Sequence, residues 1–184
     1  MARVVSAASN PRLRLVRRLE SSQQRKRLGL FACEGEDLVE AALDAGLEPV
    51  ETLVDAKRPA LLDRLPDATI VDAPLMAALS TLPHPPRVIG VFRRADLPSG
   101  TDAPVGLALW RVHDPGNLGT LIRAADALGP AFVALSEGCA DPTGPKALRA
   151  AMGATFRVPL AGWDDVTGPT VALAMDAQIG RAHV

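Results

Sequence analysis

The chain has 184 residues, of which 48% are hydrophobic and 22% are charged, a composition typical of a folded globular protein. No apolar run approaches the ~20 residues that a membrane-spanning helix needs, which excludes an integral membrane protein built from such helices. The two cysteines, Cys33 and Cys139, are too few and too far apart for a disulfide framework or a zinc site. We therefore expect a cytoplasmic protein without a metal and without a secretory signal.

Charge is unevenly distributed along the chain. The net charge is −1, but residues 1–27 carry eight basic residues against Glu20, a net +7, and the remaining residues carry −8. A basic segment on an otherwise acidic protein indicates a polyanion held at one end, and a solvated helix face is the alternative interpretation. Because aromatic residues make up only 3% of the chain, recognition of phosphate and shape by arginine is favoured over base stacking on an aromatic platform.

The first half of the chain predicts a small α/β unit that begins with a helix. Asn10 suits the N-cap of this helix and Pro11 its first position. Leu13, Val16 and Leu19 then recur at helical spacing, so we expect one stripe of the helix to be buried. Strands and helices alternate after it, which favours an α/β sandwich. The expected strands are residues 28–33, 52–54, 69–71 and 88–92, and the expected helices are residues 36–45, 59–65 and 74–81.

A second α/β unit follows a polar segment, residues 93–104, that is rich in turn-forming residues and that we interpret as a linker. Apolar runs of strand length alternate with helical patterns beyond this linker as well. The expected strands are residues 105–110, 132–135, 157–159 and 171–174, and the expected helices are residues 118–128 and 145–152.

The most informative segment runs from Asp114 to Gly129. Pro115-Gly116 suits a tight turn in which Gly takes a positive φ, and Asn117 suits the N-cap of the helix that follows. The apolar stripe of this helix is formed by Leu118, Leu121, Ile122, Ala125 and Leu128. Arg123 lies off the stripe, four residues after Gly119, and helical side chains lean towards the N-terminus. We expect its guanidinium over the bare backbone of Gly119, near free N–H groups, as an anion site.

This segment resembles the first signature motif of the SpoU/TrmH family of RNA 2′-O-ribose methyltransferases, which are SPOUT-class enzymes with a knotted α/β fold. The core of the motif in this sequence is Asn117, Gly119 and Arg123. Residues 145–160 are similar to a second segment of the family, with Ala151 where the family usually has Ser. The order of the two segments along the chain also matches the family.

The front of the chain, residues 10–35, is similar to the small substrate-binding domain that precedes the catalytic domain in many rRNA-modifying members. The resemblance implies RNA as the partner, with ribosomal RNA favoured over transfer RNA, and a homodimer for the full-length protein. The candidate RNA-contacting residues are Arg12, Arg14, Arg17, Arg18, Arg25, Arg27 and Glu34.

The chemistry implied by the resemblance is methyl transfer from S-adenosylmethionine to a ribose 2′-OH. Arg123 is the expected catalytic residue: a guanidinium stays protonated at neutral pH, so it would hold the adjacent phosphate and stabilise developing alkoxide charge. Asn117 is expected to orient Arg123 or the ribose. Two alternatives stay open, namely that Arg123 is the ion-pair partner of Asp114 or Asp126, and that Glu34 only complements a helix dipole.

Two further motifs of the family, a Gly-x-Glu-Gly loop and an Ile-Pro…Ser-Leu-Asn-Val segment, do not occur in this sequence. In the family they form the knot and most of the S-adenosylmethionine pocket, so we assign no cofactor-binding residue and expect an inactive fragment. We expect an RNA substrate-binding domain at 1–94, a linker at 95–104 and a partial SpoU methyltransferase domain without its knot at 105–178. Residues 179–184 resemble a translated sequencing adapter and are expected to be non-native.

Two other functions stay open at this point. One is a non-catalytic RNA-binding module, which calorimetric titration with S-adenosylmethionine would distinguish from the enzyme. The other is a nucleotide-binding α/β enzyme that uses the glycine-containing turn. The second is weakly supported, because Gly116 and Gly119 do not form the Gly-x-Gly-x-x-Gly pattern.

Overall fold

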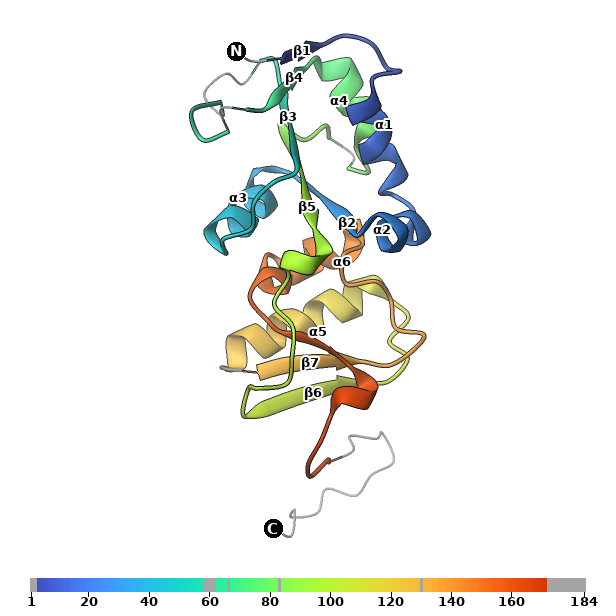
Figure 1. Ribbon diagram of the computed structural model, residues 1–184, viewed down its shortest axis with the longest axis vertical. Helices are drawn as coiled ribbons and strands as arrows, with labels where there is room; N and C mark the ends of the chain where they lie inside the picture. The colour runs from blue at the N-terminus through green and yellow to red at the C-terminus, as the bar shows by residue number, and fades with distance from the viewer. Residues whose placement is uncertain (1–2, 58–61, 66, 83, 130, 172–184) are drawn as a thin grey trace.

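The computed structural model describes residues 3–57, 62–65, 67–82, 84–129 and 131–171. Its strands form two separate sheets, stacked along the long axis of the molecule with helices between and around them (Figure 1). The mixed α/β architecture confirms the fold class expected from the sequence. No helix of the described ranges is both long and apolar enough to cross a membrane.

The first unit has a five-stranded sheet with helices on both faces. Its strands lie in the order β1-β4-β3-β5-β2. Strands β1, β4 and β3 run parallel to one another, and β5 runs antiparallel to both of its neighbours, β3 and β2. The elements are β1 (Arg3–Val5), α1 (Pro11–Arg18), α2 (Ser22–Leu28), β2 (Leu30–Glu34), α3 (Glu36–Asp44), β3 (Glu51–Asp55), β4 (Thr69–Val71), α4 (Ala73–Leu79), β5 (Val88–Arg93) and the 3₁₀ turn η2 (Arg94–Asp96).

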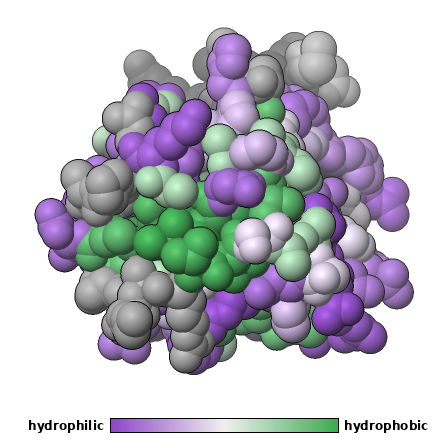
Figure 2. All heavy atoms as spheres, turned by 90° about the horizontal axis from the view of Figure 1, so that it is seen from above, coloured by the Kyte–Doolittle hydropathy of each residue, from purple (hydrophilic) through white to green (hydrophobic). Residues whose placement is uncertain are grey.

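Helices α1 and α4 pack on one face of this sheet, and α3 packs on the other (Figure 1). The buried stripe predicted for α1 is confirmed, because Leu13, Val16 and Leu19 all lie in the core. The predicted cap is confirmed too, since the Asn10 side chain accepts a hydrogen bond from the Arg12 N–H at 2.9 Å. Seen from the β1 end, an apolar patch lies among hydrophilic side chains (Figure 2).

The second unit has three parallel strands in the order β6-β7-β8. Two helices cross over between them and share a core of Leu109, Leu118, Ile122, Ala125, Val133, Ala151, Ala154 and Val158 with the strands. The elements are β6 (Val105–Leu109), α5 (Pro115–Leu128), β7 (Ala131–Leu135), α6 (Pro145–Ala151), η3 (Ala154–Phe156), β8 (Leu160–Gly162) and η4 (Trp163–Asp165).

Some element boundaries differ from those expected. Gly29 adopts φ 64° and ends α2, a helix that the sequence patterns did not predict, so β2 begins two residues later than expected. The strand expected at 157–159 is instead Leu160–Gly162, because Pro159 has no N–H to pair in a strand. Residues 59–61 of the helix expected at 59–65, and most of the strand expected at 171–174, lie outside the described residues, as does the 179–184 tail.

The segment expected as a linker is attached to the second sheet. The Gly100 N–H donates to the Leu160 carbonyl at 3.2 Å, and the Leu160 N–H donates to the Pro98 carbonyl at 3.0 Å. Ser99 also forms a parallel bridge with Leu160. Residues 95–104 therefore connect the two sheets, and residues 98–100 of this segment are hydrogen-bonded to the edge strand β8.

The two units share an apolar junction. Phe31 of β2 stacks on Phe156 of η3, with ring centroids 6.2 Å apart, and Leu148 of α6 is buried in the same cluster. The core beneath α3 is thus completed by side chains of the second unit. Burial of this kind fixes where α6 lies relative to β2.

Beside the apolar junction, the carboxylate of Asp141 accepts five hydrogen bonds. Oδ2 accepts from Arg25 Nε at 2.8 Å and from the Ser22 hydroxyl at 3.3 Å. Oδ1 accepts from Arg94 at 2.9 Å and from the Thr143 N–H and hydroxyl at 3.0 and 2.7 Å. Burial acts to raise the pKa of Asp141, but the hydrogen bonds from Arg94 and Thr143 outweigh it and leave the pKa well below its ordinary value. One charged group therefore joins α2, η2 and the loop before α6.

We expect Asp141→Asn to destabilise the protein by about 3–5 kcal/mol, because it leaves the buried Arg25 charge without its partner. Urea unfolding at pH 7 measures the change. The matched control is Asp126→Asn, which removes a more exposed partner of Arg157 and should cost less than about 1 kcal/mol. Equal stability of the two variants would contradict a special role for Asp141.

The same carboxylate predicts a pH dependence. Since its pKa is lower in the folded protein than the ~3.9 of an unfolded Asp, the unfolded state binds the proton first as the pH falls. Its contribution to the free energy of unfolding is complete above about pH 5 and is lost as the pH drops below ~4. The stability difference between wild type and Asp141→Asn should therefore shrink between pH 7 and pH 3.

Candidate functional site

The Asp114–Gly129 segment forms α5, and its start differs from the expectation. Asp114, not Asn117, is the N-cap, because its carboxylate accepts a hydrogen bond from the Asn117 N–H at 2.8 Å. Pro115 occupies the first helical position and Gly116 the second, without a positive φ, so the tight turn expected at Pro115-Gly116 is wrong. An Asp-Pro pair begins this helix as the Asn10-Pro11 pair begins α1.

Gly119 has a different function from the one expected. It is buried where α5 crosses α6, and a Cβ at this position would lie 2.3 Å from the Ala147 carbonyl oxygen and 2.7 Å from the Ala150 Cβ. The bare backbone of Gly119 therefore allows two helices to approach closely and does not form the floor of an anion site. Leu128 also differs from the expected stripe, since it is 88% exposed at the end of the helix.

Arg123 projects from the exposed side of α5, and its guanidinium has no carboxylate partner in the described part of the chain. Its Nη1 lies 2.9 Å from the Met152 Sδ, which is only a weak acceptor. The donors of the guanidinium are therefore available to an anion.

Both carboxylates that the sequence offered as ion-pair partners of Arg123 are committed elsewhere. Asp114 binds Lys146 at 2.8 Å, and the Lys146 hydrogen bond holds the pKa of Asp114 below its ordinary value. Asp126 binds Arg157 at 2.6 Å, and this hydrogen bond raises the pKa of Arg157. The structural ion-pair interpretation of Arg123 is wrong.

Met152 was not singled out from the sequence, yet it lies beside Arg123 at the end of α6. It adopts a left-handed conformation, φ 50°, and Gly153 follows with φ 85°. Left-handed backbone at a side chain with a Cβ is strained and is found most often where the surroundings enforce it. A Cβ at Gly153 would lie 2.8 Å from the Ala41 Cβ of α3, so the tight turn fits against the first unit. In the sequence, the Gly153 that follows the helix expected at 145–152 was the signal for a left-handed helix end.

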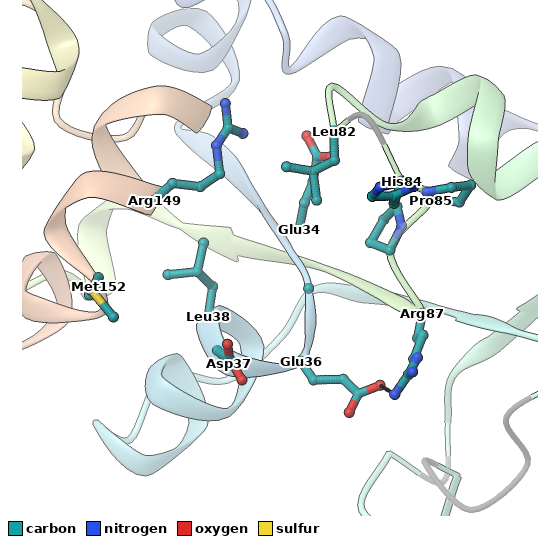
Figure 3. A pocket seen from close by; sticks show the side chains of 12 residues that line it. Glu34, Glu36, Asp37, Leu38, Leu82, His84, Pro85, Arg87, Arg149 and Met152 are labelled. Carbon is teal, nitrogen blue, oxygen red and sulfur yellow. Dashed lines mark hydrogen bonds and ion pairs between the residues drawn. The ribbon is translucent and has the colours of Figure 1, made fainter.

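A pocket of about 580 Å³ opens between the two units beside this turn (Figure 3). Arg149 and Met152 of α6 line one side, and the β2–α3 junction and the segment before β5 line the other. Glu36 and Arg87 form an ion pair at 3.3 Å on the far wall. The pocket therefore combines side chains of both units next to Arg123.

Glu34 holds the wall of this pocket together. Its carboxylate accepts from the Ser80 hydroxyl at 2.7 Å and from the Thr81 N–H and hydroxyl at 3.0 and 2.7 Å. Arg149 in turn donates to the Thr81 hydroxyl at 3.2 Å. Glu34 therefore connects the end of α4 to β2 and shapes the pocket, and its direct contact with RNA stays a prediction.

The basic segment divides into structural and surface residues. Arg25 is 4% exposed and donates to Asp141 and to the Leu19 and Glu20 carbonyls, so it does not reach the surface as an RNA contact. Arg12 turns inward as well and pairs with Glu51 at 2.7 Å. The basic side chains of this segment that are exposed or partly exposed and have no carboxylate partner among the described residues are Arg14, Arg17, Arg18, Lys26 and Arg27.

Asn117 is exposed on the first turn of α5. The hydrogen bonds of the described residues include none between its side chain and Arg123, and a spacing of six residues places the two on different faces of the helix. The structure therefore does not bring these two candidate residues together. No group of three potential metal ligands occurs in the ranges that the structure describes.

Two polar side chains at the carboxyl edge of the second sheet are paired within the protein. The Ser136 hydroxyl accepts from the Arg111 N–H at 2.8 Å, and the Cys139 thiol lies 3.3 Å from the Leu109 carbonyl oxygen. The buried side-chain polar atom left unpaired in the described ranges, Thr155 Oγ1, lies in η3, away from this edge. We assign no residue to S-adenosylmethionine.

The fold and the site define an α/β protein with two sheets, in which a unit with a basic surface is joined to a parallel-sheet unit with an available arginine. Comparison with protein-family models matches residues 104–175 to the SpoU rRNA Methylase family and residues 10–90 to the MRM3-like substrate binding domain. The chain therefore belongs to the SpoU/TrmH family, as its motifs indicated.

The proteins to which this chain is similar align with both of its units. An uncharacterized tRNA/rRNA methyltransferase of Synechocystis is 32% identical over 84% of this chain and 60% of its own length. The 23S rRNA (guanosine(2553)-2′-O)-methyltransferase RlmP of Bacillus subtilis is 32% identical over 85% of this chain and 63% of its own. The crystal structure of an AdoMet-bound rRNA methyltransferase from Sinorhizobium meliloti has a TM-score of 0.73 at 28% identity, over 88% of this chain and 64% of that one. The chain thus spans less than two thirds of each.

We expect Gly119→Ala to destabilise the protein by about 1–3 kcal/mol, because the new methyl group would overlap backbone atoms of α6. Thermal or urea unfolding measures the change, with the exposed neighbour Thr120→Ala as the control. In an unobstructed helix the same Gly→Ala change would stabilise by roughly 0.5–1 kcal/mol. A stabilised variant would therefore show that the α5–α6 approach is not tight.

Proposed function

We propose that this protein acts in S-adenosylmethionine-dependent 2′-O-ribose methylation of RNA, with ribosomal RNA as the favoured substrate. Family membership supports methyl transfer, and the 2′-O position is the one named for the Bacillus subtilis relative. The observation that carries the proposal on this chain is Arg123, an exposed guanidinium whose potential carboxylate partners are bound to other side chains.

In this proposal Arg123 holds the phosphate next to the target ribose and stabilises the negative charge that develops on the 2′-oxygen. Its planar fork of N–H donors matches phosphate geometry. The contact with the Met152 sulfur is weak and leaves the charge of the side chain without a carboxylate partner among the described residues. Asn117 is proposed to contact the ribose and not Arg123, because the two lie on different helix faces.

The first unit is proposed to hold the RNA. Arg14, Arg17, Arg18 and Arg27 present positive charge from α1 and α2. Because α2 is bound to Asp141 through Arg25, this surface is fixed relative to α6 and to the pocket beside Arg123. RNA bound on the basic surface of α1 and α2 would therefore meet the second unit in a defined orientation.

A non-catalytic RNA-binding module is the second candidate. The observation that favours it lies at the carboxyl edge of the second sheet, where Ser136 and Cys139 are paired within the protein. Calorimetric titration with S-adenosylmethionine, in a form of the protein that also carries the two cofactor segments, separates the two: a saturable heat of binding favours the enzyme, and none favours the module.

We expect the double variant Arg14→Gln/Arg18→Gln to weaken RNA binding and to reduce the slope of log K against log salt by about 1.4, or ~0.7 for each lost contact with single-stranded RNA. Fluorescence anisotropy of labelled RNA between 50 and 200 mM salt, a range of about 0.6 in log units, measures the slope. The control, Arg64→Gln/Arg93→Gln, removes the same charge from exposed positions elsewhere on the first unit. Equal slopes for both variants would reject α1 as the RNA surface.

We expect Arg123→Ala to lower methyl transfer about 100- to 1,000-fold while changing stability by less than ~0.5 kcal/mol, because the side chain is exposed and acts on the transition state. Arg123→Lys keeps the charge but loses the planar fork and should recover little. The assay follows tritium transfer to RNA in a form of the protein that carries the two cofactor segments, because we expect no turnover from these 184 residues.

Thr120→Ala, one turn earlier on the exposed side of α5, is the matched control for Arg123. Turnover by Arg123→Lys close to that of the unchanged protein would reject a bidentate role. Turnover by Arg123→Ala equal to that of Thr120→Ala would show that Arg123 takes no part in catalysis.

A further inference from the structure

The two tryptophans of the chain lie together at the carboxyl edge of the second sheet, although they are far apart in sequence. Trp110 directly follows β6 and Trp163 follows β8. Their ring centroids are 5.0 Å apart with the planes inclined at 63°. Trp110 is nevertheless 61% exposed, so the pair is open to solvent and is not part of a core.

The rest of the aromatic side chains are used differently. All four phenylalanines are buried, and the chain has no tyrosine. The exposed aromatic surface of this protein is therefore concentrated at one place. A large apolar ring left in water is unfavourable, and aromatic rings exposed in a cluster commonly mark a binding surface.

The Arg111 side chain lies beside the tryptophan pair, and the backbone of Arg111 is strained. The Arg111 guanidinium carbon lies 5.6 Å from the centre of the Trp110 ring, within the range of a cation–π contact. Arg111 has φ 49°, an uncommon value for a residue with a Cβ, and its N–H is held by the Ser136 hydroxyl at 2.8 Å. Strain of this kind is kept where the surrounding structure enforces it, and it is enriched at binding sites.

A cavity of about 550 Å³ opens at this point, within the size range of small-ligand sites. Gly138 lines the cavity with φ 86°, and a Cβ there would be in van der Waals contact with Arg111 and His113, at 3.6 and 3.7 Å. The carboxylates of Glu137 and Asp164 stand at the rim. The site thus offers an aromatic face, a cation for phosphate and acceptors for exocyclic amino groups.

We propose that this tryptophan site stacks one nucleobase of bound RNA, an inference that rests on the proposed function of RNA binding. An unpaired base has a π-face for Trp110, amino groups for the rim carboxylates and a phosphate within reach of Arg111. The site lies beyond the N-terminal end of α5, whereas Arg123 lies further along that helix. The protein would therefore hold RNA at three places: the basic surface of α1 and α2, Arg123, and the tryptophan site.

Intrinsic tryptophan fluorescence tests this directly, because both fluorophores of the chain lie in the site. We expect a short single-stranded RNA to quench the emission with the same midpoint that anisotropy of the labelled RNA gives. Trp110→Ala should weaken RNA binding about tenfold, and the remaining Trp163 should be quenched less. The matched control is Leu128→Ala, which removes an exposed apolar side chain at the other end of α5 and should leave binding unchanged.

Two further ligands identify what the site recognises. Polyphosphate has the charge of RNA but no bases, and should compete for the basic surface without quenching. S-adenosylmethionine alone should not quench. Quenching by polyphosphate, quenching by S-adenosylmethionine without RNA, or emission that changes with protein concentration instead of RNA would each overturn the proposal.

The outcomes separate the two proposals. RNA binding seen by anisotropy without any change in tryptophan emission would reject the stacking site and leave the proposed function intact. No RNA binding by either measurement would reject both. Because Trp110→Ala could unfold the edge of the sheet, Trp110→Phe is measured beside it, and it should retain most of the affinity by keeping an aromatic face.

Discussion

The buried carboxylate of Asp141 is the interaction on which the arrangement of this molecule depends. It binds α2 through Arg25, η2 through Arg94 and its own loop through Thr143. The same loop leads directly into α6, and α6 packs on α5 at Gly119. The direction of Arg123 is therefore set by a chain of contacts that starts at an ion pair between the units. A buried charge is costly alone, so each partner of Asp141 depends on the others.

Basic residues in this protein serve two physical purposes that charge counting does not separate. The net +7 of the first 27 residues indicated a polyanion surface, but Arg12 and Arg25 are used for internal ion pairs with Glu51 and Asp141. At Arg123 the opposite holds, since nearby carboxylates are neutralised by Lys146 and Arg157. The two kinds of pairing decide which arginines are free to bind an anion. Only the three-dimensional structure shows which arginines these are.

Local patterns in the sequence predicted much of this fold. The Asn10-Pro11 cap, the buried stripe of α1 and β4 at Thr69–Val71 follow from neighbouring residues alone, and they occur as expected. The Asp114 cap was missed because Asn117 offered an equally good signal three residues later. The partners of Arg25 and the meeting of Trp110 with Trp163 join distant segments, and no periodicity could indicate them. What the sequence could not supply was long-range pairing.

The shared cluster of Phe31, Leu148 and Phe156 has a consequence for how the chain folds. The sheets divide the molecule at residues 95–104, but the hydrophobic core does not divide there, since α6 and η3 complete the layer beneath α3. Cutting at the topological boundary would expose those rings and leave the Arg25 guanidinium unpaired in the first unit. The two units are therefore one cooperative folding block, in which melting of either removes the support of the other.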